Sequence, residues 1–170
     1  MSNEIQGNQY VEIADEHWTG THQEMRQKAD AIMRTHSVAQ HPVLGKVNLG
    51  SRKSRAKTLG HMKTPHEFQS VQAIPEIIAT GKVVSSLPDR ENRADVIAVH
   101  KIEHGLKIGD AKYRAQVTIR ETQDGAKATR RFYLHRIDPM AKRKAGSPYL
   151  RALRLSAQNS GPAGEENLIQ

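Results

Sequence analysis

The stretch KYRAQVTIRETQDGAKATRRFYLHRI, residues 112–137, decides the fold class of this chain. Apolar and polar side chains alternate along 112–121 and again along 130–137, which is the pattern of strands with one buried face. Gln123-Asp124-Gly125 between them is a common hairpin turn. These segments therefore predict two antiparallel strands joined by a tight connection.

Two more strands are expected before this hairpin, over residues 82–87 and 94–103, with a turn at 88–92. Successive strands with short turns imply an antiparallel meander, because parallel neighbours need a long crossover. Residues 47–49 are compatible with a further short strand.

The first half of the chain is predicted to be mainly helical. An apolar stripe at three- and four-residue spacing lies within residues 15–36 and consists of Trp18, Met25, Ala29, Ile32 and Met33. Ser51 is suited to cap a second helix over 51–62. The fold class is therefore α+β, with N-terminal helices packed on an antiparallel sheet of about four strands.

A third helix is expected over residues 67–80. Pro75 should bend this helix or split it in two, because proline cannot donate a backbone hydrogen bond. Gly81 should end it. A proline after Thr64 separates it from the preceding helix.

The predicted domains are an N-terminal helical extension at 1–45, a compact domain at 46–138 and a basic C-terminal segment with a mobile tail at 139–170. Residues 1–10 are expected to be disordered, and a short helix is expected around 149–155.

The composition favours a polyanionic partner. The 170 residues are 36% hydrophobic and carry a net charge of +8, with a pI near 9.9. Such an excess points first to nucleic acid and second to an anionic membrane surface. Cysteine is absent, which excludes disulfides, thiol nucleophiles and zinc-thiolate sites.

The sequence predicts no membrane partner. No apolar run approaches the ~20 residues needed to span a bilayer, and the polar start of the chain does not have the apolar core of a signal peptide. We therefore expect action in the cytoplasm of a host or recipient cell, with any secretion or phage-borne delivery handled by a dedicated system.

Several kinds of catalytic site are excluded by spacing. The nine histidines are scattered, and His100 and His104 would lie ~13 Å apart on an ideal strand, so no metal and no cofactor is expected. Gly45-Lys46 is followed by valine, which does not fit a phosphate-binding loop. The G-x-S-x-G signature of a serine hydrolase is absent.

Metal-independent cleavage of RNA fits the remaining residues. RNA supplies its own nucleophile, the 2′-hydroxyl, so an enzyme needs a base, an acid and cations that stabilise the phosphate charge. Histidine suits the first two tasks because its pKa of ~6.5 lies near neutral pH, and arginine or lysine suits the third. The expected catalytic set is His61, His135, Tyr133, Lys57 and Arg120.

Within this set one of the two histidines would be the base and the other the acid, and the sequence leaves the assignment open. Tyr133 would orient the phosphate or donate to it, while Lys57 and Arg120 would stabilise its charge.

Strand alternation predicts where these side chains point. Phe132 and Leu134 should be buried against the helices, which leaves Tyr133 and His135 on the open face. On the neighbouring strand, residues 113, 115, 117 and 119 should form the core face and Arg120 should point outward. The predicted RNA contacts are Arg52, Lys53, Arg55, Lys63, Thr118, Arg131, Lys142, Arg143 and Lys144.

Four runs of the sequence resemble a known family. They are VNLGSRKSRAKTLGHMK, VQAIPEIIATGK, HGLKIGDAKYRAQVTIRETQDG and RRFYLHRID, within residues 46–138. Together they resemble the large polyvalent protein-associated domains of phages and mobile elements, a group similar to the barnase–EndoU–colicin–RelE (BECR) fold of small ribonucleases and toxins.

The resemblance implies a four-stranded antiparallel sheet, ribonuclease toxin activity and an acidic immunity protein or antitoxin as a partner. By position, His61 matches the helix histidine of the family, and Tyr133 with His135 matches its final-strand pair. Lys57 and Thr58 match the segment before the helix histidine. The assignment of Arg120 to the site rests on strand alternation alone.

Other functions are compatible with the same residues. One is a non-catalytic module that binds nucleic acid or a protein partner through the same basic face. Another is a protein-interaction domain whose charge serves an acidic partner, and a third is an ADP-ribosyl or other nucleotide-transfer toxin. Each side chain taken singly also fits an ordinary surface position.

Overall fold

The computed structural model describes residues 10–88 and 96–140. The chain divides into two units, 1–138 and 139–170, and the helices and strands described here belong to the first, apart from the last residue of the final strand. The predicted features at 1–9, in the turn after Pro88 and beyond residue 140 lie outside the described residues.

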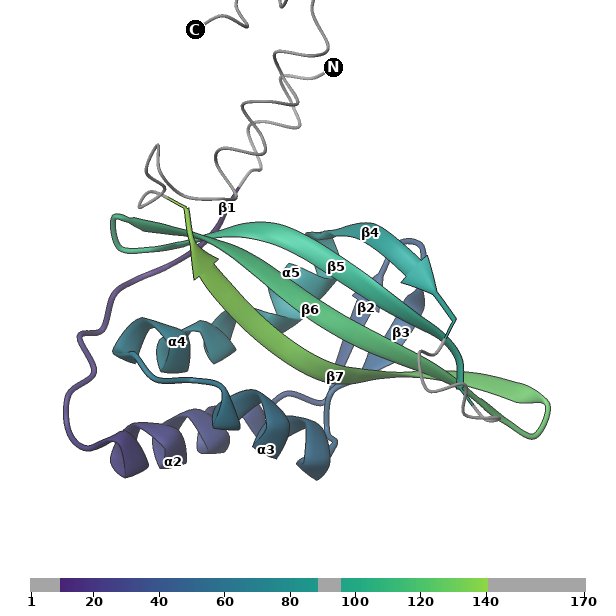
Figure 1. Ribbon diagram of the computed structural model, residues 1–170, viewed down its shortest axis with the longest axis horizontal. Coiled ribbons are helices and arrows are strands. Elements are labelled where there is room, and N and C mark those ends of the chain that lie inside the picture. The colour runs from purple at the N-terminus through teal and green to yellow at the C-terminus, as the bar shows by residue number, and fades with distance from the viewer. Residues whose placement is uncertain (1–9, 89–95, 141–170) are drawn as a thin grey trace, which may run out of the picture. The chain divides into compact units, whose positions relative to one another are not determined.

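The centre of the fold is a curved, mixed sheet of seven strands (Figure 1). Its order is β1-β5-β6-β7-β3-β2, and β4 also pairs with β5. The strands are β1 Tyr10–Ile13, β2 Val38–His41, β3 Gly45–Asn48, β4 Lys82–Leu87, β5 Val96–Ile108, β6 Ala111–Asp124 and β7 Lys127–Pro139.

The predicted α+β class is confirmed, and so is the antiparallel meander of β4, β5 and β6. Strand β4 has the predicted bounds, while β5 and β6 are longer than predicted and pair from Val96↔Thr122 to Ile108↔Ala111. The prediction of about four strands is wrong. The additional strands are only four residues long, and β1 and β3 each pair with a strand distant in sequence. Strand β3 overlaps the short strand expected at residues 47–49.

Two of the added pairings are parallel. Strand β1 runs along β5, with Tyr10 opposite Gly105, and β3 meets β7 at the single pair Asn48↔Arg131. Strand β2 then pairs antiparallel with β3 and ends the order. Beyond Arg131, β7 therefore has no further pairing with β3.

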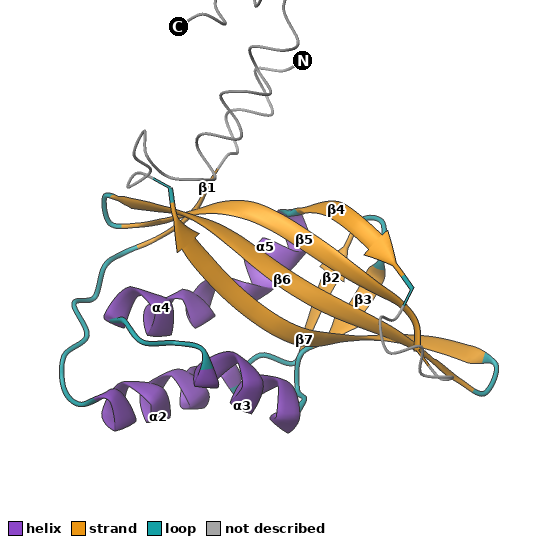
Figure 2. Cartoon of the chain, viewed as in Figure 1, coloured by secondary structure: helices purple, strands orange, loops and turns teal. Residues whose placement is uncertain are grey.

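The helices lie on one side of the curved sheet (Figure 2). They are α2 His22–Met33, α3 Arg52–Gly60, α4 Pro65–Gln69, the 3-10 helix η1 Ser70–Ala73 and α5 Ile74–Thr80. They alternate with β1, β2 and β3 along the chain, so the predicted order of helices first and strands afterwards is wrong. None of the helices in the described ranges has the length and apolar character needed to cross a membrane.

Helix α2 starts seven residues later than predicted because its N-terminal cap is at Thr21. The Thr21 side chain accepts from the Glu24 backbone N–H, and the Glu24 carboxylate accepts from the Thr21 backbone N–H, forming a capping box. Gly20 just before it has a φ of +110°, a conformation that favours glycine.

The predicted effects of the prolines and of Gly81 on α4 and α5 are confirmed. Thr64 caps α4, Pro65 is in its first turn, and the helical segment is split so that Pro75 lies in the first turn of α5. Gly81 ends α5 in an extended conformation. A β-carbon on Gly81 would collide with the Ile102 side chain and the Ile77 carbonyl oxygen, so close approach is the reason for glycine there.

One apolar core fills the space between the helices and the sheet. Phe68, Ile74, Ile77 and Ile78 contribute from the helical side, and Phe132 contributes from β7. The predicted core face of β6 is confirmed for residues 115, 117 and 119, which are fully buried, while Tyr113 is half-buried.

Helix α3 occupies the edge of β7 that β3 leaves unpaired. The Ser54 hydroxyl donates to the Phe132 carbonyl oxygen at 2.6 Å, and the His135 backbone N–H donates to the Thr58 hydroxyl at 3.2 Å. Both side chains are buried. Two residues of one helix, one turn apart, therefore replace a neighbouring strand.

These contacts also show that the alternation of β7 slips between Phe132 and His135. In a regular strand, residues three apart direct their backbone groups to opposite edges and their side chains to opposite faces. Here both residues face α3 with a backbone group, and both side chains are buried. We infer a bulge-like irregularity at residues 133–134.

We expect Thr58→Val to lower the free energy of unfolding by about 1–3 kcal/mol, because the buried His135 N–H would have no acceptor. Chemical denaturation measures the change. Thr80→Val is the matched control, because Thr80 is exposed, and it should change the free energy by less than about 0.5 kcal/mol. Equal effects of the two substitutions would contradict the proposed role of Thr58.

Candidate nucleic-acid interface

A pocket of about 580 Å³ lies between the first turns of α3 and the strands β5, β6 and β7. We call it the basic pocket. Its lining residues are Ser51, Lys53, Ser54, Lys57, Val96, Arg120, Thr122, Arg131, Phe132 and Tyr133. Segments about eighty residues apart in sequence thus meet around one hollow.

The basic pocket has four cationic side chains and no carboxylate in its lining. Among the described residues, neither Lys57 nor Arg120 forms an ion pair with an acidic side chain. Arg131 donates to the Thr122 hydroxyl at 3.2 Å. Lys57 and Arg120, two neighbouring cations without an acidic partner in this part of the structure, favour an anionic ligand.

Local structure explains how α3 presents its lysines. Ser51 caps the helix by accepting from the Ser54 backbone N–H, and its first turn contains no acidic residue. Lys53 and Lys57 each precede one of the two hydroxyl residues that fix α3 to β7. Being four residues apart, the lysines share one side of the helix, and both line the pocket.

Tyr133 contacts two cations. The Arg120 guanidinium is 3.8 Å from the centre of the phenol ring, and the Lys57 ammonium is 4.9 Å from it. Both distances fit cation–π contacts. Arg120 Nε is buried without a hydrogen-bond partner in the described part of the chain, so this stacking is a main contact of the guanidinium.

The two cations also act on the phenol electrostatically. Burial alone would raise the pKa of Tyr133, but a hydrogen bond from Lys57 and the positive charge of Arg120 outweigh it, and the net pKa lies below the ordinary value of 10.0. The Tyr133 phenol therefore loses its proton more readily than that of an ordinary tyrosine.

The structure brings together three members of the predicted catalytic set, namely Lys57, Arg120 and Tyr133, with Lys53 and Arg131 beside them. Two other predicted contacts, Arg52 and Arg55, line a separate groove between α2 and α3. Lys63 and Thr118 line neither of these hollows. Lys142, Arg143 and Lys144 lie outside the described residues.

The predicted position of His135 on the open face is wrong. Its ring is fully buried, and Nε2 lies 2.8 Å from the Ser70 hydroxyl on the helical side of the molecule. The error follows from the slip in β7, which reverses the faces after Tyr133. His135 is not a residue of the basic pocket.

The contacts of His135 fix its protonation. The Ser70 hydroxyl donates its proton to the Glu67 carbonyl oxygen at 2.6 Å, so His135 Nε2 must be the donor toward Ser70. Nδ1 is then a buried acceptor with no partner in the described structure. Burial lowers the pKa of His135 to about 3, and the neutral ring has no access to a substrate.

His61 forms the C-terminal cap of α3 and is exposed. Like His135, it does not line the basic pocket. The two imidazoles therefore do not meet across this hollow as the sequence predicted.

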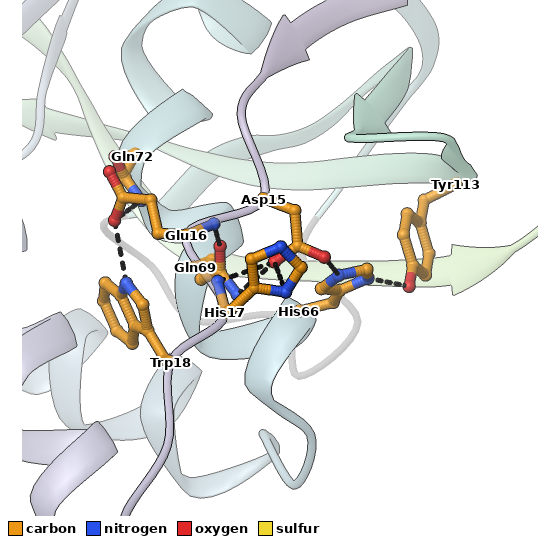
Figure 3. A network of polar contacts seen from close by, with 8 residues as sticks. All are labelled: Asp15, Glu16, His17, Trp18, His66, Gln69, Gln72 and Tyr113. Carbon is orange, nitrogen blue, oxygen red and sulfur yellow. Dashed lines mark hydrogen bonds and ion pairs between the residues drawn. The ribbon is translucent and has the colours of Figure 1, made fainter.

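A second polar cluster, which the sequence did not predict, surrounds Asp15 (Figure 3). His66 Nε2 donates to Asp15 Oδ2 at 2.8 Å, and His66 Nδ1 lies 2.5 Å from the Tyr113 hydroxyl. Gln69 Nε2 and the His17 backbone N–H donate to the other Asp15 oxygen. These contacts join the segment after β1 to α4 and β6.

The pKa shifts in this cluster indicate a structural connection. The His66 hydrogen bond and the His17 N–H lower the pKa of Asp15 to about 2, so the carboxylate is charged at neutral pH. Burial and the nearby charge of Asp15 raise the pKa of the Tyr113 phenol, which keeps its proton. A nucleophilic tyrosine would require the opposite shift.

No group of three or more histidine, aspartate or glutamate side chains in residues 10–88 and 96–140 is arranged to hold a metal ion. The basic pocket instead offers the hydrogen-bond donors of lysine and arginine side chains to an anion.

Comparison with known proteins identifies the family of this chain. The family model for large polyvalent protein-associated domain 3 matches residues 20–133. No curated protein and no solved structure matches the chain. The expected likeness to the BECR fold therefore stays a prediction.

Acidification should destabilise the protein through His135. The unfolded residue takes up a proton near pH ~6.5, whereas the folded residue stays neutral until about pH 3. Full stability is thus present above pH ~6.5 and declines below it, by at most about 1.4 kcal/mol per pH unit from this group.

We expect His135→Leu to flatten the dependence of the unfolding free energy on pH between about 7 and 5, as measured by urea denaturation. His61→Gln, at an exposed histidine, should keep the wild-type slope. A wild-type slope in the His135→Leu variant would show that His135 is not a buried neutral group.

Proposed function

The chain belongs to the large polyvalent protein-associated domain 3 family, and we propose that it is a nucleic-acid-binding domain that holds RNA phosphates in the basic pocket. The observation that carries this proposal is the convergence of Lys57 and Arg120 on Tyr133 in a hollow without a carboxylate.

The arrangement of donors suits phosphate. Arginine and lysine make strong, charge-assisted hydrogen bonds to phosphate oxygens. The first turn of α3 adds its positive helix end and the Ser51 hydroxyl to the same hollow. The net charge of +8 would draw a polyanion toward the domain over longer distances.

Recognition of this kind would not depend on base sequence. One face of Tyr133 is already covered by the Arg120 guanidinium, which limits stacking of a base on the ring. Contacts to phosphate position a strand but carry no sequence information. We therefore propose backbone binding that tolerates different base sequences.

We expect Lys57→Gln and Arg120→Gln each to weaken binding of a single-stranded RNA oligonucleotide in a fluorescence-anisotropy titration. The plot of log affinity against log salt should become shallower by about 0.7 for each lost phosphate contact, because fewer counterions are released. Circular dichroism would verify that each variant is folded.

Lys82→Gln is the matched control for this experiment. Lys82 is exposed at the start of β4 and lines none of the hollows described, so the variant should bind as wild type does. If Lys57→Gln and Arg120→Gln behave like Lys82→Gln, the basic pocket is not the RNA site. A single-stranded DNA of the same sequence tests whether the 2′-hydroxyl contributes.

A second candidate function is metal-independent cleavage of the bound RNA, which the lowered pKa of Tyr133 favours. The Tyr133 phenolate would take the proton of the 2′-hydroxyl, whose oxygen then attacks phosphorus. The bond from phosphorus to the 5′-oxygen would break, with Lys57 donating a proton to that oxygen and Arg120 stabilising the phosphate charge. The products would be a 2′,3′-cyclic phosphate and a 5′-hydroxyl end.

If the domain cleaves RNA in this way, Tyr133→Phe should reduce the rate by about 10²–10⁴-fold, since the base is lost, while RNA affinity changes little. Gel electrophoresis of a labelled RNA measures the rate. His61→Ala should cleave as wild type does, a 2′-deoxy nucleotide at the cut should block the reaction, and EDTA should not. Undiminished cleavage by Tyr133→Phe would exclude this mechanism.

A further inference from the structure

Two further hollows follow the basic pocket along the surface of the described domain. The middle hollow, of about 510 Å³, shares Ser51 and Arg131 with the basic pocket. The third hollow, of about 210 Å³, lies between α2 and α3 and shares Arg34 with the middle one. Because neighbouring hollows share lining residues, the three hollows lie one after another on the surface.

We propose that these three hollows form one track for a single-stranded nucleic acid, running from the basic pocket past the N-terminus of α3 into the groove between α2 and α3. The inference deepens the proposed function, on which it rests, because it assigns the length and path of the strand. A strand would bind through several consecutive phosphates instead of one.

The charges along the track support this path. The middle hollow contains Arg34 and Arg131 and no carboxylate. The third hollow contains four arginines and a single acid, Asp30, in its lining. Its cationic residues are Arg26, Arg34, Arg52 and Arg55.

Asp30, the single acid of the third hollow, pairs with two of its four arginines. Its two carboxylate oxygens accept from Arg34 Nε at 2.8 Å and from Arg55 Nε at 3.1 Å. Arg55 also donates to the Gly50 carbonyl oxygen. The carboxylate thus holds two arginines at the groove, while Arg26 and Arg52 form no ion pair within the described residues and are available to phosphate.

The shape of the third hollow favours one strand over a duplex. Side chains of α2 and α3 line it, and the two helices lie next to each other (Figure 1). A hollow of about 210 Å³ can hold part of one backbone, whereas a duplex presents two backbones separated by grooves of about 6 and 12 Å. Single-strand binding sites commonly include a basic groove that follows the backbone over several nucleotides.

A length series tests the track. Wild-type protein is titrated with a labelled uridine trinucleotide and a labelled uridine dodecanucleotide at several salt concentrations. We expect the dodecanucleotide to bind more tightly and with a steeper salt dependence. In the double variant Arg26→Gln/Arg52→Gln the salt slope for the dodecanucleotide should decrease by about 1.4, from two lost contacts, while trinucleotide binding stays unchanged.

Two controls sharpen the result. Arg26→Lys/Arg52→Lys keeps the charges and should retain most of the dodecanucleotide affinity, which separates charge from a loss of folding. Lys57→Gln should weaken binding of both oligonucleotides, because it acts in the basic pocket.

The track is overturned if the double glutamine variant binds the dodecanucleotide as wild type does while Lys57→Gln still weakens both ligands. In that outcome the proposed function stands and only the path fails. If Lys57→Gln also has no effect, the proposed function itself fails. Binding of an oligoglutamate of matched charge as tightly as the dodecanucleotide would assign the surface to an acidic protein instead.

Discussion

The edge of β7 beyond Arg131 is the constraint on which the candidate site depends. A strand edge inside a packed domain must find partners for its N–H and C=O groups, and β3 supplies only one pair to β7. Helix α3 supplies two further partners through Ser54 and Thr58. Because these hydroxyls fix the rotation of α3, they also determine that Lys53 and Lys57 face the pocket.

The charge distribution shows how unusual the basic pocket is within the described domain. Several arginines on other parts of the sheet have acidic partners, as in Arg114 with Glu103 and Arg130 with Glu121. Lys57 and Arg120 instead both contact the aromatic ring of Tyr133. Like charges held close together oppose folding, and a bound anion would relieve this repulsion. Two neighbouring cations without an acidic partner in the described residues are what a binding site for an anion would contain.

Most of the histidines that suggested chemistry connect segments of the fold. His41 Nε2 lies 3.0 Å from the Gly81 carbonyl oxygen, and its Nδ1 accepts from two backbone N–H groups. His100 joins Ser86 to Glu121. Imidazole suits this use because it can donate from one nitrogen and accept at the other. The histidines with such contacts are His22, His36, His41, His66, His100 and His135.

The sequence by itself determined the features that depend on neighbouring residues. Alternation along β6, the cap at Ser51 and the interruption at Pro75 all follow from local propensities, and each is present in the structure. The excess of positive charge also needs no coordinates. Alternation further placed Arg120 and Tyr133 on the face where they meet Lys57.

Only the tertiary structure decided which distant segments pair and which face of β7 each residue occupies. Strands β1 and β2 are too short to be recognised without their partners, and the short strand expected at residues 47–49 overlaps β3 without revealing its pairing with β7. The slip at residues 133–134 arises where α3 replaces a strand as the neighbour of β7, so it depends on a contact almost eighty residues away in sequence. Periodicity assumes a regular strand and thus placed His135 on the wrong face, whereas packing against α3 and Ser70 buries it in the core.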